Sequence, residues 1–574
     1  MSGASLYILT CSARNRMRLR LRRLREPRYL LGALVGVSYL VFTFVIRQQV
    51  YDGRRSGRAA ATAVGAAATA FGVPGATMGG VLLACLALVS WVLPLRSHLL
   101  EFTAAETAFL FPSPMSRAQR VLYRILRSQS SVLLGAFIMA IAYPTGSMPG
   151  RLRGMLAVWL LLMTSHVFFT GVTVARSAAG SRRALGRMVS WLAGLLPAAA
   201  VASVLLPLIR QARVSPLDSA GAVLAVVTGI ATTGTAQWLL WPFTTLVTPL
   251  FAETAGPWAA ASLFALLLYG ICVGWLLLVD AGSPDVAEAV VERVDLQPQR
   301  RGRTYVVRRA PWTLAPIGAP ETAFMWKGAL QSSRTVDRRL LIRGLVILIW
   351  IIGSSLLVSR SRGLTALMSV GAIWGAMFSL LMGPQMIRVD LRQDLARLDW
   401  LRTLPVRGAA VIRGQMLWPA LSVTLLTWVF ALLAAALTTA ADHEWPDSEQ
   451  VSIWLAFMAV APGVVFAEYT MHNAVAVWFP AWVPLGTTRA RGVEAAGQRL
   501  ILLLANWIGL ALALVPGALV TAALWYGLPV LRPWTLPVGA SVASVLALAE
   551  VWLVTEGLGR TFERIDLTDV ERPD

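Results

Sequence analysis

The feature that most constrains this chain is a succession of long apolar stretches. A bilayer core about 30 Å thick needs roughly 20 apolar residues in one spanning helix. The chain has 574 residues, of which 57% are hydrophobic and 14% are charged. We therefore expect an all-α integral membrane protein with about twelve transmembrane helices. Their expected positions are 29–46, 79–95, 129–145, 155–175, 188–209, 257–279, 342–358, 365–387, 416–439, 452–474, 498–524 and 536–556.

The distribution of arginine predicts how these helices are oriented. If the N-terminus is cytoplasmic, the loops on the cytoplasmic side hold 40 of the 51 basic residues. Such an excess follows the positive-inside rule, although Arg54, Arg55 and Arg58 lie in an outer loop. We expect a multi-pass protein with both termini in the cytoplasm. The net charge of +22 then reflects topology and contact with anionic lipids, and we expect no nucleic-acid partner.

One stretch, residues 216–256, does not have the pattern of a single transmembrane helix. It is apolar, but Pro242 and Pro249 interrupt it. An even number of crossings is needed here to keep the next basic loop inside. The stretch is interpreted as a re-entrant or surface-lying hairpin on the outer side, and two further full spans would satisfy the charge rule equally well.

A short motif occurs twice, with its copies 291 residues apart. The first copy, residues 109–121, reads FLFPSPMSRAQRV, and the second, residues 400–412, reads WLRTLPVRGAAVI. Each copy follows the second apolar stretch of its half of the chain. We infer two parallel six-helix repeats, 1–285 and 311–574, related by an axis along the membrane normal and joined by a cytoplasmic linker at 286–310.

Each repeat begins with a segment that is expected to lie in the membrane interface. In residues 4–26, Met17, Leu21 and Leu24 form one apolar stripe, and arginines line both of its edges. Such a helix buries its stripe in the bilayer surface while its arginines reach the lipid phosphates. Residues 321–341 repeat this pattern loosely. A disordered basic tail is the alternative for the N-terminal segment.

The repeated motif is predicted to be a turn followed by a helix start, within cytoplasmic loops 96–128 and 388–413. Ser116 and Gln119 form a capping-box pattern after two prolines. A surface knob of this kind can carry movement from a soluble partner into the spanning helices, and the alternative is that it only ties two helices together. The expected contact residues are Glu106, Phe109, Phe111, Pro114, Arg117, Leu401, Leu404, Pro405 and Arg407.

The order of interfacial helix, helix pair and coupling helix resembles the permease of an ABC-2-type exporter. Four segments resemble a family of large ABC exporter permeases: LRRLREPRYLLG at 21–32, FTAAETAFLFPSP at 102–114, DLRQDLARLDWLRTLP at 390–405 and FPAWVPL at 479–485. In that family both six-helix halves lie on one chain. The resemblance implies a separate ABC-type ATPase, with two copies per permease chain, and a location in the bacterial inner (cytoplasmic) membrane.

No residue pattern predicts chemistry on this chain itself. The Gly-x-x-x-x-Gly-Lys-Ser/Thr loop that cradles nucleotide phosphates is absent, so ATP and Mg are expected on the partner ATPase and no cofactor on this chain. The three cysteines and four histidines show neither metal-ligand spacing nor a catalytic constellation. The chain is therefore expected to be a transport subunit rather than an enzyme. Its 22 tryptophans suggest a lipid-handling surface, and hence a lipidic or amphipathic substrate.

Four ionisable residues lie at predicted membrane depth, where an unpaired charge is costly. They are His166, Glu468, His472 and Glu550. They suggest a polar translocation path or a proton-linked step, and hydrogen bonds between helices are the simpler alternative. Two other function classes remain open. A secondary transporter of the major-facilitator plan would also have twelve spans, but its loop signature is absent, and a membrane glycosyltransferase would need an acidic cluster that the first outer loop lacks.

Overall fold

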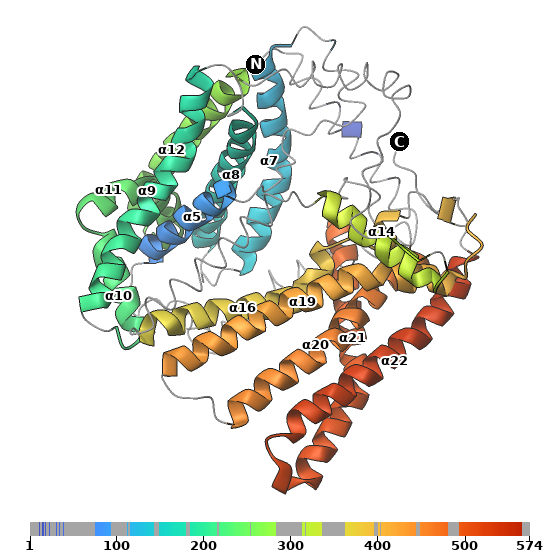
Figure 1. Ribbon diagram of the computed structural model, residues 1–574. Helices are drawn as coiled ribbons and strands as arrows, with labels where there is room; N and C mark the ends of the chain where they lie inside the picture. Colours follow the sequence, from blue (N-terminus) through green and yellow to red (C-terminus); the bar gives the residue numbers. More distant parts are fainter. Residues whose placement is uncertain are drawn as a thin grey trace. The chain divides into compact units, whose positions relative to one another are not determined.

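The fold is seen in a computed structural model of the chain (Figure 1). Apart from isolated positions, the structure describes residues 75–92, 115–142, 148–178, 184–214, 217–252, 254–282, 317–335, 362–394, 403–442, 448–479 and 493–564.

The described elements are helices, as expected for an all-α membrane protein. Within the described ranges, eight helices are long and apolar enough to cross a bilayer. They correspond to eight of the predicted stretches and are α8 (Met148–Ala178), α9 (Ala184–Val214), α12 (Ala255–Gly282), α16 (Arg362–Met386), α19 (Gly408–Asp442), α20 (Ser448–Trp478), α21 (Val493–Gly527) and α22 (Thr535–Phe562). The protein is thus a multi-pass membrane protein.

The other four predicted stretches have different outcomes. Residues 79–95 and 129–145 correspond to α5 (Gly75–Val92) and α7 (Arg117–Ala142). Both form helices in the described residues, where α5 is apolar but shorter than a full span and the first half of α7 carries four arginines. The ends of both predicted stretches lie outside the described residues, so these two spans stay predictions. The predicted helices at 29–46 and 342–358, the interfacial helix at 4–26 and the linker at 286–310 lie almost wholly outside the described residues.

The uncertain stretch 216–256 forms two helices, α10 (Ala220–Ala231) and α11 (Gly234–Phe251), which are bent by 93° where they meet. Gly234 adopts a φ of 58° at the bend, a conformation that glycine reaches without steric cost. At about 1.5 Å per residue, α10 is too short to cross a bilayer. The pair is therefore a broken span or a re-entrant loop rather than two full spans. The prolines do not make the break, since both lie inside α11.

The described residues divide into two compact units. Unit 1 holds chiefly α5 to α12. In it α8 packs against α7 and α12, while α5 packs against α9 and α11. The indole N–H of Trp159 on α8 donates to Gln129 on α7 at 2.9 Å, and the Gln129 amide donates to the Tyr269 hydroxyl on α12 at 3.3 Å. Polar links of this kind join helices inside lipid.

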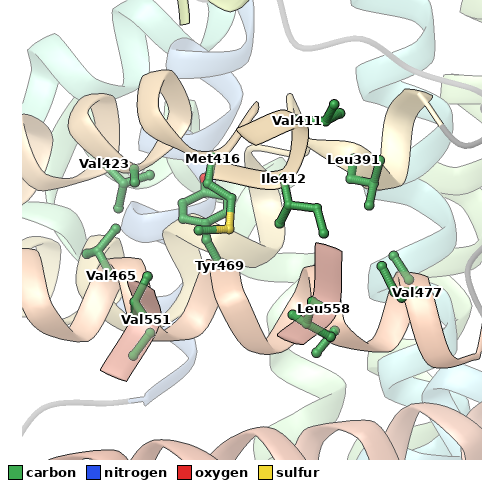
Figure 2. Packing of buried hydrophobic residues seen from close by; sticks show 14 of the residues in the cluster. Leu391, Val411, Ile412, Met416, Val423, Val465, Tyr469, Val477, Val551 and Leu558 are labelled. Atoms are coloured by element: carbon green, nitrogen blue, oxygen red, sulfur yellow. The ribbon is translucent and has the colours of Figure 1, made fainter. Parts of the chain in front are cut away.

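Unit 2 holds α14 (Pro320–Thr335), α16, α17 (Leu391–Asp394) and α19 to α22. Helix α16 lies along α19, α20 lies along α22, and α21 packs on α22 (Figure 1). The core of the unit gathers buried side chains from α17, α19, α20 and α22 around Tyr469 and Met416, as Figure 2 shows. We call the region where α16 ends and α19 begins the motif end, because the second motif copy lies there.

Small residues allow the helices of unit 2 to approach closely, as is usual for helices in a membrane. A Cβ atom added to Gly559 on α22 would lie 2.3 Å from the backbone nitrogen of Ala409 on α19. On α20, Gly463 lies against Ser544 and Ala547 of α22, and its N–H donates to the Ser544 hydroxyl at 3.0 Å. Glycine is thus required by packing at both crossings.

Proline inside a spanning helix frees a carbonyl that must find another donor. Pro462 lies inside α20 and leaves the carbonyl of Met458 without its helical partner. The indole N–H of Trp428 on α19 donates to that oxygen at 2.8 Å. A neighbouring helix therefore restores the hydrogen bond and ties α19 to α20 at the same point.

Candidate functional site

The candidate site is the loop between α16 and α19, residues 387–407, which carries the second motif copy. Residues 395–399 and 402 of this loop lie outside the described residues. Its first residues are held by a buried ion pair. The guanidinium of Arg392 lies 2.6 Å from the Asp390 carboxylate and also donates to the carbonyl of Pro384 at 2.8 Å. The side chains of Arg392 and Asp390 are only 8% and 0% exposed. A buried pair satisfied in this way fixes local geometry, since neither partner tolerates loss of the other.

Helix α20 contacts the same part of the loop. The hydroxyl of Tyr469, a fully buried side chain, donates to the carbonyl of Ile387 at 2.9 Å. This bond satisfies a carbonyl just beyond the end of α16, where no helical donor remains. The start of the loop is therefore fixed to α16 and to α20 together.

A second ionic contact joins the loop to α14. Asp394 on α17 pairs with Lys327 on α14, and the same carboxylate accepts from the amide of Gln415 on α19 at 3.0 Å. Lys327 is the single lysine of the chain. Within the predicted interfacial segment 321–341, α14 packs along α19, where the Trp418 indole donates to Ser332 at 2.8 Å. The loop is thus linked through Asp394 to both α14 and α19.

The far end of the loop is anchored to α22. The N–H of Gly408, the first residue of α19, donates to the Glu563 carboxylate at 2.8 Å. A carboxylate at a helix N-terminus satisfies a free donor and complements the helix dipole. Arg413 pairs with Glu556 at 2.6 Å one turn further on. The second motif copy lacks a capping serine, and a residue from another helix supplies the cap instead.

Between these anchors, several described residues of the loop, which we call its tip, are exposed. Trp400 is 57% exposed, and Thr403, Pro405 and Arg407 are also exposed. Leu401 was predicted as a contact, but it is only 2% exposed and belongs to the core of unit 2. It is therefore not accessible to a partner in this conformation. Leu404, also predicted, is half-buried against the same core and is at most a partial contact.

The first motif copy is described only in part. Ser116 and Gln119 form the predicted capping box at the start of α7: the Ser116 N–H donates to the Gln119 side chain at 3.0 Å and the Gln119 N–H to the Ser116 hydroxyl at 3.3 Å. Arg117 reaches the carbonyl of Asp280, at the end of α12, at 3.5 Å. The predicted contacts Glu106, Phe109, Phe111 and Pro114 lie outside the described residues.

The polar residues predicted at membrane depth do not form one cluster. Glu468 and His472 lie four residues apart on α20, whereas His166 and Glu550 are half-buried on α8 and α22. Glu468 is only 1% exposed, and its Oε2 has no hydrogen-bond partner among the described residues. The same holds for Nε2 of His472 and Oδ1 of Asn473. One stretch of α20 therefore carries three unmatched polar atoms.

Sequence reasoning found the motif but missed the residues that hold it. Asp390, Arg392 and Tyr469 fix the start of the loop, which we call its base. Trp400 is the exposed aromatic residue at the tip. The alternation of acidic and basic residues at 390–394 was the available signal, because charges so close to an apolar span need partners. Tyr469 gave no signal, since its partner is a backbone carbonyl 82 residues away in the chain.

A scan of protein-family models finds none that matches this chain, and a search of curated proteins also finds no match. The function is therefore inferred from the residues and their geometry.

Proposed function

We propose that this chain is the transmembrane permease subunit of an ABC-type exporter, driven by a separate ATPase subunit. The single observation that carries the proposal is the exposed tip of loop 387–407, together with the contacts that fix the start of the loop to the spanning helices. An exposed tryptophan and proline present rigid surface to a partner, and aromatic and arginine side chains are the commonest anchors of protein interfaces. The tip, with Trp400, Pro405 and Arg407, has this composition.

The base of the loop gives the tip a mechanical role. Movement of the tip is passed to α16 and α20 through Asp390, Arg392 and Tyr469, and to α14 and α19 through Asp394. A loop without such contacts would change its own conformation when a bound partner moves. A loop fixed by these contacts instead transmits the displacement into the spanning helices, as an ATP-driven transporter requires.

The repeat of the motif extends this role to both halves of the chain. Two coupling elements on one chain imply two ATPase copies per permease, one beneath each half. The motif then faces the cytoplasm, both termini lie in the cytoplasm, and the protein is located in the bacterial inner membrane. ATP and Mg bind to the partner, and this chain contributes no ATP hydrolysis of its own.

Affinity purification of the chain from its native membrane tests the proposal. We expect a protein with a nucleotide-binding P-loop to copurify, and native mass spectrometry to give two such subunits per permease chain. The purified chain alone should not hydrolyse ATP, whereas the complex should. A complex of two permease chains with two ATPases would contradict the fused-halves interpretation.

A matched pair of variants then tests the tip itself. Trp400→Ala should reduce assembly or uncouple hydrolysis from transport, because loss of a central aromatic anchor commonly costs about 2 kcal/mol or more. Trp534→Ala is the control: this tryptophan is also partly exposed, at 47%, but it precedes α22 and lies at the opposite end of that helix from Gly559 and Glu563. Equal effects of the two changes would remove the support for a coupling tip.

A secondary, proton-linked transporter is the second candidate function, and Glu468 favours it. A carboxyl buried in a spanning helix without a partner is the usual position for a proton carrier. Under this alternative, Glu468→Gln abolishes transport driven by a proton gradient, and no ATPase copurifies. Under the permease proposal, transport by the Gln variant still depends on ATP.

A further inference from the structure

Unit 1 contains a pocket that has no role in the coupling proposed for loop 387–407. The pocket lies among α5, α8, α9, α11 and α12 and has a volume of about 90 Å³. Its walls include Leu83, Ala87, Phe168, Phe243, Leu268 and Cys272, and only apolar surface faces it. The hydroxyl of Thr164, which also lines it, donates to the carbonyl of Leu160 at 2.7 Å within α8.

The depth of the pocket decides what can reach it. Residues 164–169 lie near the middle of the span Leu152–Arg176, and residues 268–272 lie near the middle of the span Ala255–Asp280. The middle of a spanning helix lies at the centre of the hydrocarbon core, where lipid chains are the surrounding solvent. A ligand that enters at this level comes from the membrane rather than from water.

Exposed apolar side chains of α12 lie next in the chain to residues that line the pocket. On α12, Leu267 is 57% exposed and Ile271 is 66% exposed, next to the pocket residues Leu268 and Cys272. The pocket is partly open. The helix that a lipid chain can contact on its exposed face therefore also supplies part of the pocket wall.

The size of the pocket excludes a bulky ligand. A dry apolar cavity of about 150 Å³ holds a benzene ring, and this pocket is smaller. A flexible, unbranched hydrocarbon chain is narrower than a ring and can fill the space from the open side. The absence of polar surface also excludes a headgroup, because an unmatched polar group inside an apolar pocket is costly.

We propose that this pocket binds the methyl end of an acyl chain from a phospholipid of the bilayer. The rigid wall formed by Phe168, which stacks on Trp275 with ring centroids 5.7 Å apart, gives the chain a fixed surface on which to pack. Pro242 and Phe243 of α11, the second helix of the bent pair, also line the pocket. The site thus gives unit 1 a position for lipid inside the membrane, and it does not depend on the proposed ATPase.

Photolabelling in lipid nanodiscs tests this site directly. The probe is a phospholipid with a diazirine near the methyl end of one acyl chain, and mass spectrometry maps its adducts. We expect adducts at Phe168 in the pocket and at Ile271 on the outer face. Excess unlabelled phospholipid should reduce both, and absence of adducts at Phe168 in nanodiscs would overturn the proposal.

Two variants of α5 form a matched comparison. Leu83→Trp adds bulk inside the pocket, whereas Leu86→Trp adds the same bulk on the exposed face, where Leu86 is 56% exposed. The first should abolish labelling at Phe168 and leave Ile271 labelled; the second should leave both. If Leu83→Trp does not fold, Ala87→Leu fills the pocket with a smaller change. Labelling at Phe168 that persists in a folded, filled variant would overturn the proposal.

Discussion

Arg392→Leu should loosen loop 387–407 far more than the loss of a similar ion pair that is only partly buried. The substitution leaves the Asp390 carboxylate buried, with the Arg392 backbone N–H as its remaining donor, at 3.1 Å. It also frees the carbonyl of Pro384, which accepts from Arg392 at 2.8 Å. Removing one partner of a buried pair costs about 3–5 kcal/mol, because the other charge is left uncompensated.

The pair Arg413–Glu556 provides the comparison. It has the same N to O distance of 2.6 Å, but its side chains are 22% and 34% exposed. Water screens a pair of this kind, and exposed pairs contribute about 0–1 kcal/mol. Glu556→Gln should therefore have little effect on the stability of loop 387–407, although both pairs lie near the ends of this loop. The difference between the two variants comes from burial and not from distance.

Hydrogen–deuterium exchange measures this difference at the loop. A cost of about 3 kcal/mol raises the population of the open loop, and hence the exchange rate of its amides, roughly a hundredfold. We expect this increase in the peptide that covers 387–407 for Arg392→Leu, and less than about a tenfold increase for Glu556→Gln. Equal exchange in the two variants would refute the reasoning from burial.

A double substitution separates charge burial from packing. Asp390→Leu with Arg392→Leu removes both charges and keeps apolar volume, and such replacements are often neutral or stabilising. Loop protection should then return to within about tenfold of the parent. If the double variant exchanges as fast as Arg392→Leu alone, the loop depends on specific hydrogen bonds and not on charge compensation.

Three further predictions follow from single contacts. Ser116→Ala removes the capping-box hydroxyl at the start of α7 and should cost about 0.5–2 kcal/mol, seen as faster amide exchange in its first turn. Gly559→Leu forces a side chain against the backbone of Ala409 and should lower the thermal unfolding midpoint, at a cost of about 1–3 kcal/mol. Trp428→Phe removes the donor to Met458 and should cost about 1 kcal/mol, measured in the same thermal assay; no change would mean that lipid or water supplies the donor.

The sequence was sufficient for eight of the twelve predicted spans, because burial in lipid is a property of each segment alone. Eight apolar stretches form long helices at the predicted places, and the Ser116 and Gln119 capping box is present. Local pattern determines both features, since a span needs only length and apolarity and a cap needs only neighbours three residues apart.

Contacts between distant segments could not be predicted in this way. Leu401 resembled an exposed anchor because it matches Leu110 of the first copy, yet the core of unit 2 covers it. Its burial depends on residues such as Leu558, which lies far along the chain on α22. Likewise, Pro242 and Pro249 were predicted to interrupt the stretch, but both lie inside α11, and the bend falls between Ala231 and Gly234.

The two candidate functions converge on one turn of α20. Tyr469 ties that turn to the loop through the Ile387 carbonyl, and its chain neighbour Glu468 is buried, with no hydrogen-bond partner for its Oε2 among the described residues. Successive residues of a helix move as one body, because each is fixed by the same ladder of backbone hydrogen bonds. A displacement of loop 387–407 that is carried by Tyr469 therefore also shifts Glu468. If the loop is the coupling element, hydration of Glu468 changes when the ATPase binds, and Glu468→Gln alters the coupling without loosening the loop.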